Sequence, residues 1–327
     1  RGESFYRDRL GPVVEAFVSK GLAREDAGAI VVHYADRERP MLIRKADGGF
    51  LYATTDLAAV RFRVQELGGG RVIYVVDARQ RDHFKDVFDA IRLIGWDTLP
   101  DGSRAELSHM AFGSVMGKDK RPLKTRSGEN FTLKALLDEA VERGVQQVMR
   151  RAAEADAPTH GLPEAELRAI GTAVGIGAVK YADLSGDPVK DYVFDLDRMI
   201  AFEGDTGPYI QYAHARIASL ISRSGESAQA IATAPFAPAE PAERHLALCL
   251  LRFPGVVLAA TEHQAPQRLC AALHELANAY AGFYQACPVL KAADAATRLS
   301  RLHLSSLVQR TLAEGLSLLG IEAPSRM

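Results

Sequence analysis

Cysteine is scarce in this chain, and its few residues fit neither a disulfide framework nor a metal site. Cys249, Cys270 and Cys287 are odd in number and widely spaced. Disulfide-rich proteins and zinc sites need paired or closely spaced cysteines. We therefore expect reduced thiols that pack into a helical core, as in a cytoplasmic protein, and no bound metal ion.

Long hydrophobic runs and an excess of charge are missing too. The sequence has no apolar stretch of the roughly 18 residues or more that a membrane span needs, and no basic-then-apolar leader. The formal net charge of −1 argues against indiscriminate binding of nucleic acid, because such binders carry a basic excess. This charge is still compatible with an RNA that is recognised by shape, stacking and a few arginines.

Two glycine-rich segments lack the context of a dinucleotide-binding turn. The glycines at 68–70 precede a predicted strand, whereas a phosphate-binding turn follows a strand and opens a helix. Gly175 and Gly177 lie inside a helical pattern without a third glycine. We therefore set a dinucleotide-binding function aside.

The composition and the apolar pattern predict a globular chain whose two halves differ. With 327 residues, 47% of them hydrophobic, the chain is long enough for two or three domains. Strands are expected at 29–32, 41–44, 50–53 and 72–76, and helices at 5–21, 83–94, 133–153, 164–184, 208–222, 244–257, 266–284 and 292–319. The alternation up to residue 95 indicates an α/β layer, and the rest is almost wholly helical, with a proline-rich linker at 231–243.

The segment 50–84 is the most informative part, because polar side chains follow both of its predicted strands. Tyr52 and Asp56 come after the first strand, and Asp77, Gln80 and His83 after the second. Ligands of open α/β sheets bind outside the carboxyl ends of parallel strands. A phenol, a carboxylate and a carboxamide that converge there suit a flat cation with several donors, and a guanidinium is the obvious candidate.

Each of these side chains also has a plain structural interpretation. Asp56 falls in the first turn of a predicted helix, where the helix dipole favours a carboxylate. Tyr52 is alternatively a half-buried strand aromatic, and Gln80 a solvated loop residue. The residues alone do not choose between arginine, agmatine and a peptide side chain as the ligand.

A basic loop follows the apolar stretch that ends at Met116. It contains Lys118, Lys120, Arg121, Lys124 and Arg126, with Asp119 opposing them. Such a loop suits the triphosphate of a nucleotide, and a solvated basic loop is the alternative.

A polar and aromatic stripe is predicted on one helix of the second half. Thr206 or Gly207 caps a helix whose first position is a proline, and Tyr209, Tyr212 and Arg216 then recur on one face. Aromatic residues at this spacing commonly pack in the hydrophobic core. Rings beside a guanidinium are also what an unstacked RNA base requires.

The motifs Y-A-T-T-D-L-A-A, V-V-D-A-R-Q-x-x-H-F and E-G-D-T-G-P-Y-I-Q-Y-A-H-A-R resemble the arginyl-tRNA synthetases, class I enzymes that are specific for arginine. The resemblance covers essentially all 327 residues. It implies that Tyr52, Asp56 and Gln80 bind arginine. It also implies that His83, Met116 and Lys124 lie near ATP.

Two further sets of residues follow from this resemblance. L-K-T-R-S-G matches the family's signature loop, which stabilises the adenylation transition state, although the usual second lysine is absent; the matching residues are Lys124, Thr125, Arg126, Ser127 and Gly128. The residues expected to meet the tRNA anticodon are Tyr209, Tyr212, Arg216, Tyr284 and Met327.

The expected architecture is α/β in its first part and all-α in its second. Residues 1–160 would form a partial Rossmann-like class I catalytic domain, incomplete at its N-terminus because no His-x-Gly-His tetrapeptide occurs. Residues 161–327 would form an anticodon-binding helical bundle. We expect negligible aminoacylation from these residues alone.

The complete enzyme would be a cytoplasmic monomer that ligates arginine to tRNA-Arg with ATP and Mg²⁺, without a DNA or membrane partner. One alternative is a free-standing tRNA-binding paralogue that is not an enzyme. A second is a regulatory protein that binds arginine through Tyr52, Asp56 and Gln80.

Overall fold

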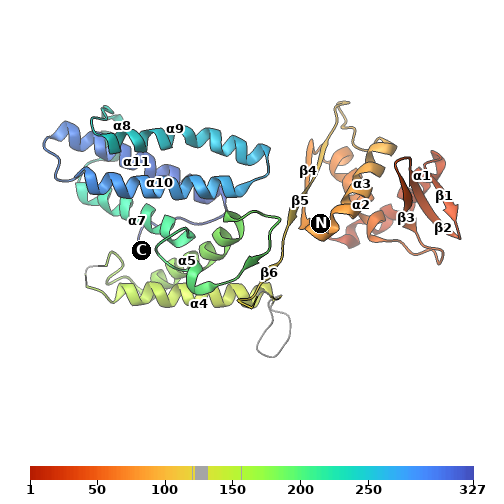
Figure 1. Cartoon of the computed structure of the whole chain (residues 1–327), viewed down its shortest axis with the longest axis horizontal. Helices are drawn as coiled ribbons and strands as arrows, with labels where there is room; N and C mark the ends of the chain where they lie inside the picture. Colours follow the sequence, from red (N-terminus) through yellow and green to blue (C-terminus); the bar gives the residue numbers. More distant parts are fainter. Residues whose placement is uncertain (120, 122–131, 156) are drawn as a thin grey trace. The chain divides into compact units, whose positions relative to one another are not determined.

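The computed structural model describes residues 1–119, 121, 132–155 and 157–327, and the chain forms two compact units (Figure 1). The first unit is Arg1–Gly113 and the second is Ser114–Met327. The domain boundary expected at residue 160 lies inside the second unit, between two long helices that pack along each other. The α/β first part and the helical second part of the prediction are confirmed.

The first unit opens with a helix and an antiparallel sheet. Its elements are η1 (Glu3–Arg9), α1 (Leu10–Ser19), β1 (Ala23–Asp26), β2 (Ala29–Tyr34) and β3 (Arg37–Arg44), with the strand order β1-β2-β3. Ala27 and Gly28 join β1 to β2 with φ angles of 47° and 83°, the left-handed pair that a tight two-residue hairpin requires. The strands predicted at 29–32 and 41–44 are confirmed.

A parallel strand pair and its helices complete this unit. The elements are α2 (Tyr52–Arg61), η2 (Phe62–Glu66), β4 (Arg71–Asp77), η3 (Ala78–Gln80), α3 (Arg81–Ile94) and β5 (Glu106–Phe112). β4 and β5 pair in parallel from Arg71 opposite Glu106 to Asp77 opposite Phe112. The helices bury Phe17, Leu57 and Ile91 in one core. The strand predicted at 72–76 and the helix predicted at 83–94 are confirmed.

The strand predicted at 50–53 is wrong. Phe50 makes a single isolated bridge to Arg44, and α2 already begins at Tyr52. The backbone N–H groups of Thr54 and Thr55 both donate to the Leu51 carbonyl, at 3.0 and 3.2 Å, so the chain turns into a helix directly after Leu51. A short apolar run does not distinguish a buried strand from the start of a buried helix.

The second unit begins with a short parallel strand pair and a pair of antiparallel helices. Its first elements are β6 (Val115–Met116), α4 (Leu133–Ala152), α5 (Glu164–Ser185), β7 (Tyr192–Val193) and α6 (Leu196–Met199). Glycine lets the backbones of α4 and α5 touch. A Cβ atom on Gly175 would lie 2.3 Å from the Ala140 carbonyl oxygen, and one on Gly144 would lie 2.3 Å from the Gly171 carbonyl oxygen. These glycines are therefore packing residues.

The remaining helices form a bundle around a leucine-rich core. They are α7 (Gly207–Ser224), α8 (Ala228–Thr233), α9 (Pro241–Glu262), α10 (Pro266–Ala286) and α11 (Ala295–Leu318). Thr206 Oγ1 accepts the Tyr209 N–H at 3.2 Å, which confirms the predicted cap of α7. The segment 234–240 between α8 and α9 is not helical and lies within the predicted linker. Leu246, Leu273 and Leu312 are fully buried in the core.

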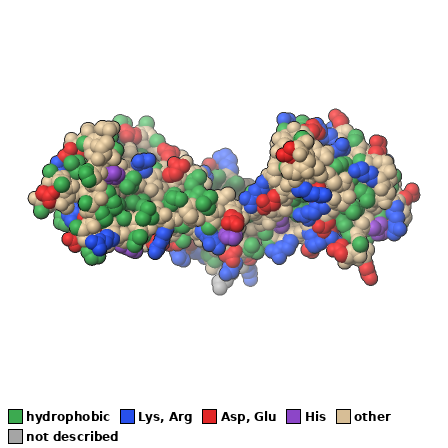
Figure 2. Space-filling model, turned by 90° about the horizontal axis from the view of Figure 1, so that it is seen from above, with side chains coloured by type: hydrophobic (Ala, Val, Ile, Leu, Met, Phe, Trp, Pro, Cys, Tyr) green, Lys and Arg blue, Asp and Glu red, His purple; other side chains and the backbone are tan. Residues whose placement is uncertain are grey.

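Helix α9 carries an exposed apolar face. Leu251 and Leu258 are 76% and 71% exposed, and Figure 2, seen from the α9 side, shows hydrophobic side chains spread over the helical unit. Among the described residues, α9 is the one helix long and apolar enough to cross a membrane, with a mean hydropathy of 1.3. Because soluble helices pass the same test, the expectation of no membrane partner stays a prediction.

The cysteines are free and buried, as predicted. Cys249 lies in α9 and Cys270 in α10, and Cys287 directly follows α10. Burial raises the pKa of the Cys270 thiol to about 12. All of them pack in the same core as Leu273.

Candidate functional site

One contact between α2 and α3 forms the centre of the predicted arginine site. Asp56 Oδ2 lies 2.7 Å from His83 Nε2. The Asp56 side chain is 25% exposed and the His83 side chain 32% exposed. The carboxylate is thus oriented by the imidazole and keeps lone pairs for another donor. Since the first turn of α2 holds no acidic residue, the predicted first-turn position of Asp56 is wrong, and the helix dipole does not explain this carboxylate.

Tyr52 and Gln80 precede this contact, one on each helix. Tyr52 lies four residues before Asp56 and therefore shares its face of α2. Gln80 is the N-cap residue of α3, three residues before His83. Tyr52 is 76% exposed, so the alternative of a half-buried strand aromatic is wrong, and Gln80 is exposed as well. Within the described part of the chain, no hydrogen bond joins either side chain to Asp56.

Asp77 fixes the turn that carries Gln80. Its carboxylate accepts the backbone N–H of Arg79 at 2.8 Å and the Arg79 guanidinium at 2.7 Å. These hydrogen bonds from Arg79 lower the pKa of the Asp77 carboxyl to about 2. Asp77 therefore acts on the turn between β4 and α3, and its carboxylate is already engaged there.

Aromatic packing holds the start of α3 against the parallel strands. The ring of the buried Phe84 lies 4.5 Å from the Tyr74 ring and 5.4 Å from the His109 ring, between centroids. Tyr74 belongs to β4 and His109 to β5. Because His83 is the neighbour of Phe84, this packing sets where its imidazole meets Asp56.

The signature loop lies outside the described residues, and the segment before it is described as far as residue 119. Met116 lies on β6, where its carbonyl accepts the Phe194 N–H at 2.8 Å. Lys118 Nζ lies 3.0 Å from Asp195 Oδ1, and this partner lowers the pKa of the Asp195 carboxyl. Lys118 therefore neutralises an acidic residue beside α6. The predicted residues outside the described part are Lys120, Lys124, Thr125, Arg126, Ser127 and Gly128.

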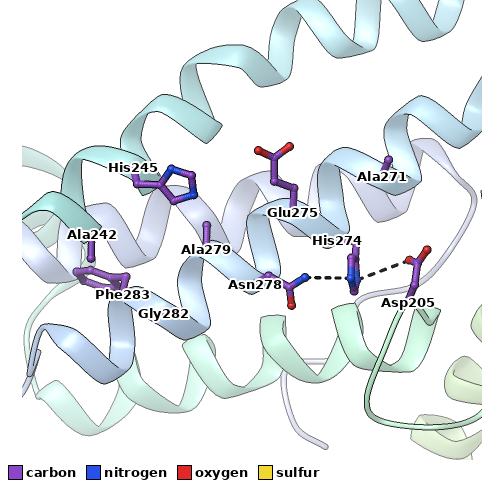
Figure 3. A pocket seen from close by; sticks show the side chains of 10 residues that line it. All are labelled: Asp205, Ala242, His245, Ala271, His274, Glu275, Asn278, Ala279, Gly282 and Phe283. Carbon is purple, nitrogen blue, oxygen red and sulfur yellow. Dashed lines mark hydrogen bonds and ion pairs between the residues drawn. The ribbon is translucent and has the colours of Figure 1, made fainter.

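Two residues of the predicted RNA face contact α10. The Arg216 guanidinium carbon lies 4.7 Å from the centroid of the Tyr284 ring, a cation–π contact. The Tyr209 hydroxyl donates to Asn278 Oδ1 at 2.8 Å. Asn278 lies at the wall of a cavity of 590 Å³ between α9 and α10, where its amide is 2.9 Å from His274 Nε2 (Figure 3).

The third residue of the stripe, Tyr212, has different partners. Its ring lies 6.2 Å from Phe202, and the Arg151 guanidinium carbon lies 4.7 Å from its centroid. Tyr212 also packs against the apolar cluster that contains Met327, which is only 4% exposed. The structure thus brings Arg216 together with Tyr284, and Tyr212 together with Met327.

The C-terminal segment is held along α7 by two buried polar side chains. Gln211 Nε2 donates to the Glu322 carbonyl at 2.7 Å, and His214 Nδ1 donates to the Pro324 carbonyl at 3.0 Å. Sequence reasoning missed both residues. The available signal was a glutamine and a histidine at positions of α7 between the residues of the predicted stripe, where burial demands a partner.

Two family models match the chain in consecutive segments. The model described as tRNA synthetases class I (R), catalytic domain, matches residues 1–196, more than half of the 327 residues. The chain belongs to the arginyl-tRNA synthetase family. A model described as the DALR anticodon binding domain matches residues 210–327 of this chain.

Curated relatives match along the whole length of this chain. The arginine–tRNA ligase of Frankia casuarinae is 46% identical over 332 residues, which cover 100% of this chain and 54% of that protein. That of Thermobifida fusca is also 46% identical, with coverage of 100% and 55%. The chain therefore spans about half the length of the curated relatives it matches.

Solved structures agree with this family. The arginyl-tRNA synthetase of Plasmodium falciparum has a TM-score of 0.85 and 27% identity, over 100% of this chain and 54% of that one. The Thermus thermophilus arginyl-tRNA synthetase has a TM-score of 0.78 and 28% identity, over 97% and 58%.

Proposed function

We propose that the full-length protein is an arginine–tRNA ligase, to which this chain contributes the arginine site and an anticodon-binding surface. The observation that carries the arginine site is the Asp56 carboxylate, which is oriented by His83. The exposed Tyr52 precedes Asp56 on α2, and the exposed Gln80 precedes His83 at the start of α3. A guanidinium is planar, permanently charged and rich in donors, so it pairs with a carboxylate through parallel hydrogen bonds. The phenol and the carboxamide supply further oxygen acceptors.

In the proposed reaction, the carboxylate of arginine attacks the α-phosphorus of ATP, and pyrophosphate leaves. A hydroxyl at the tRNA 3′ end then attacks the arginyl carbonyl, and AMP leaves. The residues of this chain act by positioning and by charge. By the family resemblance, Asp56 would orient arginine, and His83 and Met116 would each serve in binding ATP. Lys124 and Arg126 would stabilise phosphate charge, and a bound Mg²⁺ would supply further positive charge to the phosphates.

The proposed RNA surface is supported by the pairing of rings and cations on α7. Arg216 lies over Tyr284, and Arg151 lies over Tyr212. Half-buried rings that keep one edge or face near solvent can stack with unpaired bases, and the neighbouring guanidinium adds a cation–π contribution. We therefore assign Tyr209, Tyr212 and Arg216 to the anticodon arm of tRNA-Arg.

The test of the ligase activity is an aminoacylation assay on the full-length protein with Asp56→Asn. Asparagine keeps the size of the side chain and a hydrogen bond to His83 but removes the charge. We expect kcat/KM for arginine to fall by about 30-fold or more, because loss of one partner of a buried charge pair costs about 2–5 kcal/mol.

Asp82→Asn is the matched control, since Asp82 is an exposed carboxylate in the first turn of α3. Equal kcat/KM for the two variants would remove Asp56 from the arginine site. Failure of the wild-type full-length protein to charge any tRNA with arginine would contradict the ligase assignment.

A further inference from the structure

Helix α4 carries a row of arginines and glutamines on the side away from α5. Arg143, Gln146, Gln147, Arg150 and Arg151 recur at i, i+3, i+4, i+7 and i+8, which is one face of a helix. The opposite side of α4 packs on α5 through Gly144 and its buried neighbours. We call this row the α4 arginine stripe.

The stripe borders a small polar cavity. A space of 200 Å³ is lined by the stripe and by residues of α6 and the segment that follows it: Arg143, Gln146, Gln147, Arg150, Asp197, Ile200 and Ala201. Amides and guanidinium groups are the donors that proteins use for phosphate oxygens. The cavity therefore offers amide and guanidinium donors in a volume that suits a phosphate group, and its one carboxylate, Asp197, is paired with Arg143.

One of the three arginines of the stripe forms an ion pair with a described residue, and the other two do not. Arg143 Nη1 lies 2.8 Å from Asp197 Oδ1, so this pair is neutral. Arg150 is exposed in the last turn of α4 and has no ion-pair partner among the described residues. Arg151 lies over aromatic rings, 4.7 Å from Tyr212 and 4.9 Å from Phe202. Arg150 and Arg151 thus place two positive charges at this end of α4, against the one carboxylate of Glu154 just beyond it.

The stripe is continuous with the face of α7. Arg151 belongs to the stripe and contacts Tyr212, which we assign to the anticodon arm. An RNA that stacks on Tyr212 would therefore run next to the cavity at Arg150. Since half or more of protein–nucleic acid hydrogen bonds go to the backbone, a basic row beside a stacking ring suits phosphates.

We propose that the α4 arginine stripe binds the ribose–phosphate backbone of the tRNA, next to the bases that meet α7. This inference rests on the proposed function and extends the RNA surface of the second unit onto α4. Arg150 supplies the principal charge, Gln146 and Gln147 donate hydrogen bonds, and Arg143 stays paired with Asp197. Such binding reads no base, and it weakens with salt as phosphate charges are neutralised.

The test is the salt dependence of tRNA-Arg affinity for the full-length protein with Arg150→Gln. We expect Kd to rise by about 3–10-fold at moderate salt, and the slope of log K against log salt to become shallower by about 0.7–0.9, the value for one phosphate contact. Arg150→Lys should keep the wild-type slope, because lysine still neutralises a phosphate. Arg244→Gln, at an exposed arginine of α9, is the matched control and should keep wild-type affinity and slope.

The outcomes separate this inference from the proposed function. If Arg150→Gln keeps the tRNA affinity and salt slope of Arg244→Gln while Tyr212→Ala weakens tRNA binding, the proposed role of the α4 arginine stripe is wrong. The proposed RNA surface on α7 is then retained. A rise in Kd without a change in slope overturns the backbone contact, since a neutralised phosphate must appear in the salt dependence. Absence of tRNA binding by the wild-type protein overturns both.

Discussion

The two candidate sites differ in how their polar side chains are held. In Arg1–Gly113, Asp56 and His83 bond to each other, while Tyr52 and Gln80 remain exposed. In Ser114–Met327, the tyrosines and the arginine of α7 are already held by partners on other elements. A small cationic ligand needs acceptors that are still open. A surface for stacking gains from rings that are already immobile, because less conformational freedom is lost on binding.

The difference has a cause in local structure. Tyr52 begins α2 and Gln80 precedes α3, so their side chains lie at helix starts where neighbouring elements leave room. Tyr209, Tyr212 and Arg216 lie within α7, which packs on α5, α10 and α11. The comparison predicts that substitutions in the helical core of the second unit mainly lower its stability. Substitutions at the exposed side chains of the first site should mainly lower substrate affinity.

The largest expected effect is on the stability of the second unit. Gly175→Ala would place a methyl group 2.3 Å from the Ala140 carbonyl oxygen, so α4 and α5 must move apart. We expect the free energy of unfolding to fall by about 3 kcal/mol, at the upper end of typical overpacking costs. Chemical denaturation followed by circular dichroism measures this.

Gly255→Ala is the control for that experiment. Gly255 lies inside α9, and a Cβ atom there would meet nothing within 4 Å. Alanine should then stabilise the helix by about 0.5–1 kcal/mol. Equal effects of the two substitutions would show that the backbones of α4 and α5 are not in close contact.

The second effect separates the two sites directly. Tyr212→Ala should weaken tRNA affinity by about 1–3 kcal/mol if a base stacks on this ring. Tyr52→Ala should raise KM for arginine and leave tRNA affinity unchanged. Filter binding and steady-state kinetics on the full-length protein measure both. A variant that affects both quantities equally would show that the sites do not act separately.

The third effect is a pH dependence of the stability of the second unit, which comes from His214. Burial lowers the pKa of His214 below its ordinary value of 6.5, with Nδ1–H donating to the Pro324 carbonyl. The neutral form is therefore favoured in the folded state. The stabilising contribution is complete above about pH 6.5 and is lost as the pH falls through the lowered pKa.

Denaturation of the wild-type chain and of His214→Gln between about pH 7.5 and pH 5 measures this contribution. The difference in unfolding free energy between the wild-type chain and His214→Gln should shrink toward acid pH. His263→Gln, at an exposed histidine that follows α9, should show a constant difference. A constant difference for His214→Gln as well would contradict the buried neutral imidazole.

The smallest effect concerns thiol reactivity, which reports on the second unit alone because the cysteines all lie there. Burial raises the pKa of the Cys270 thiol to about 12, so little thiolate forms at pH 8. Native protein should react slowly with a thiol reagent, and urea should release rapid reaction. Rapid reaction of Cys270 in the native protein would show that the bundle core is open.

Much of the fold follows from periodic patterns that the sequence displays. The helices at 133–153, 164–184 and 266–284 are predictable because long apolar periods allow no other element. The cap at Thr206 with Pro208 is predictable from local chemistry. The start of α2 is not predictable, because a run of only four hydrophobic residues at 50–53 fits a strand or a helix equally well.

The candidate site was predictable in its residue types but not in its contacts. The carboxylate of Asp56 points to a cationic ligand from chemistry alone, yet its bond to His83 depends on how α2 packs beside α3. The partner Arg151 of Tyr212 is distant in the sequence, so this contact carries no local signal. The need for glycine at position 175 is evident only from the structure, because it comes from the close approach of the Ala140 backbone on another helix.

The central claim is that the charge of Asp56 selects a guanidinium, and calorimetry with arginine and citrulline tests it most directly. Citrulline has nearly the shape of arginine but a neutral ureido group. The wild-type full-length protein should bind arginine at least about 30-fold more tightly than citrulline, and Asp56→Asn should reduce this ratio to near one. An undiminished preference for arginine in Asp56→Asn would contradict the claim.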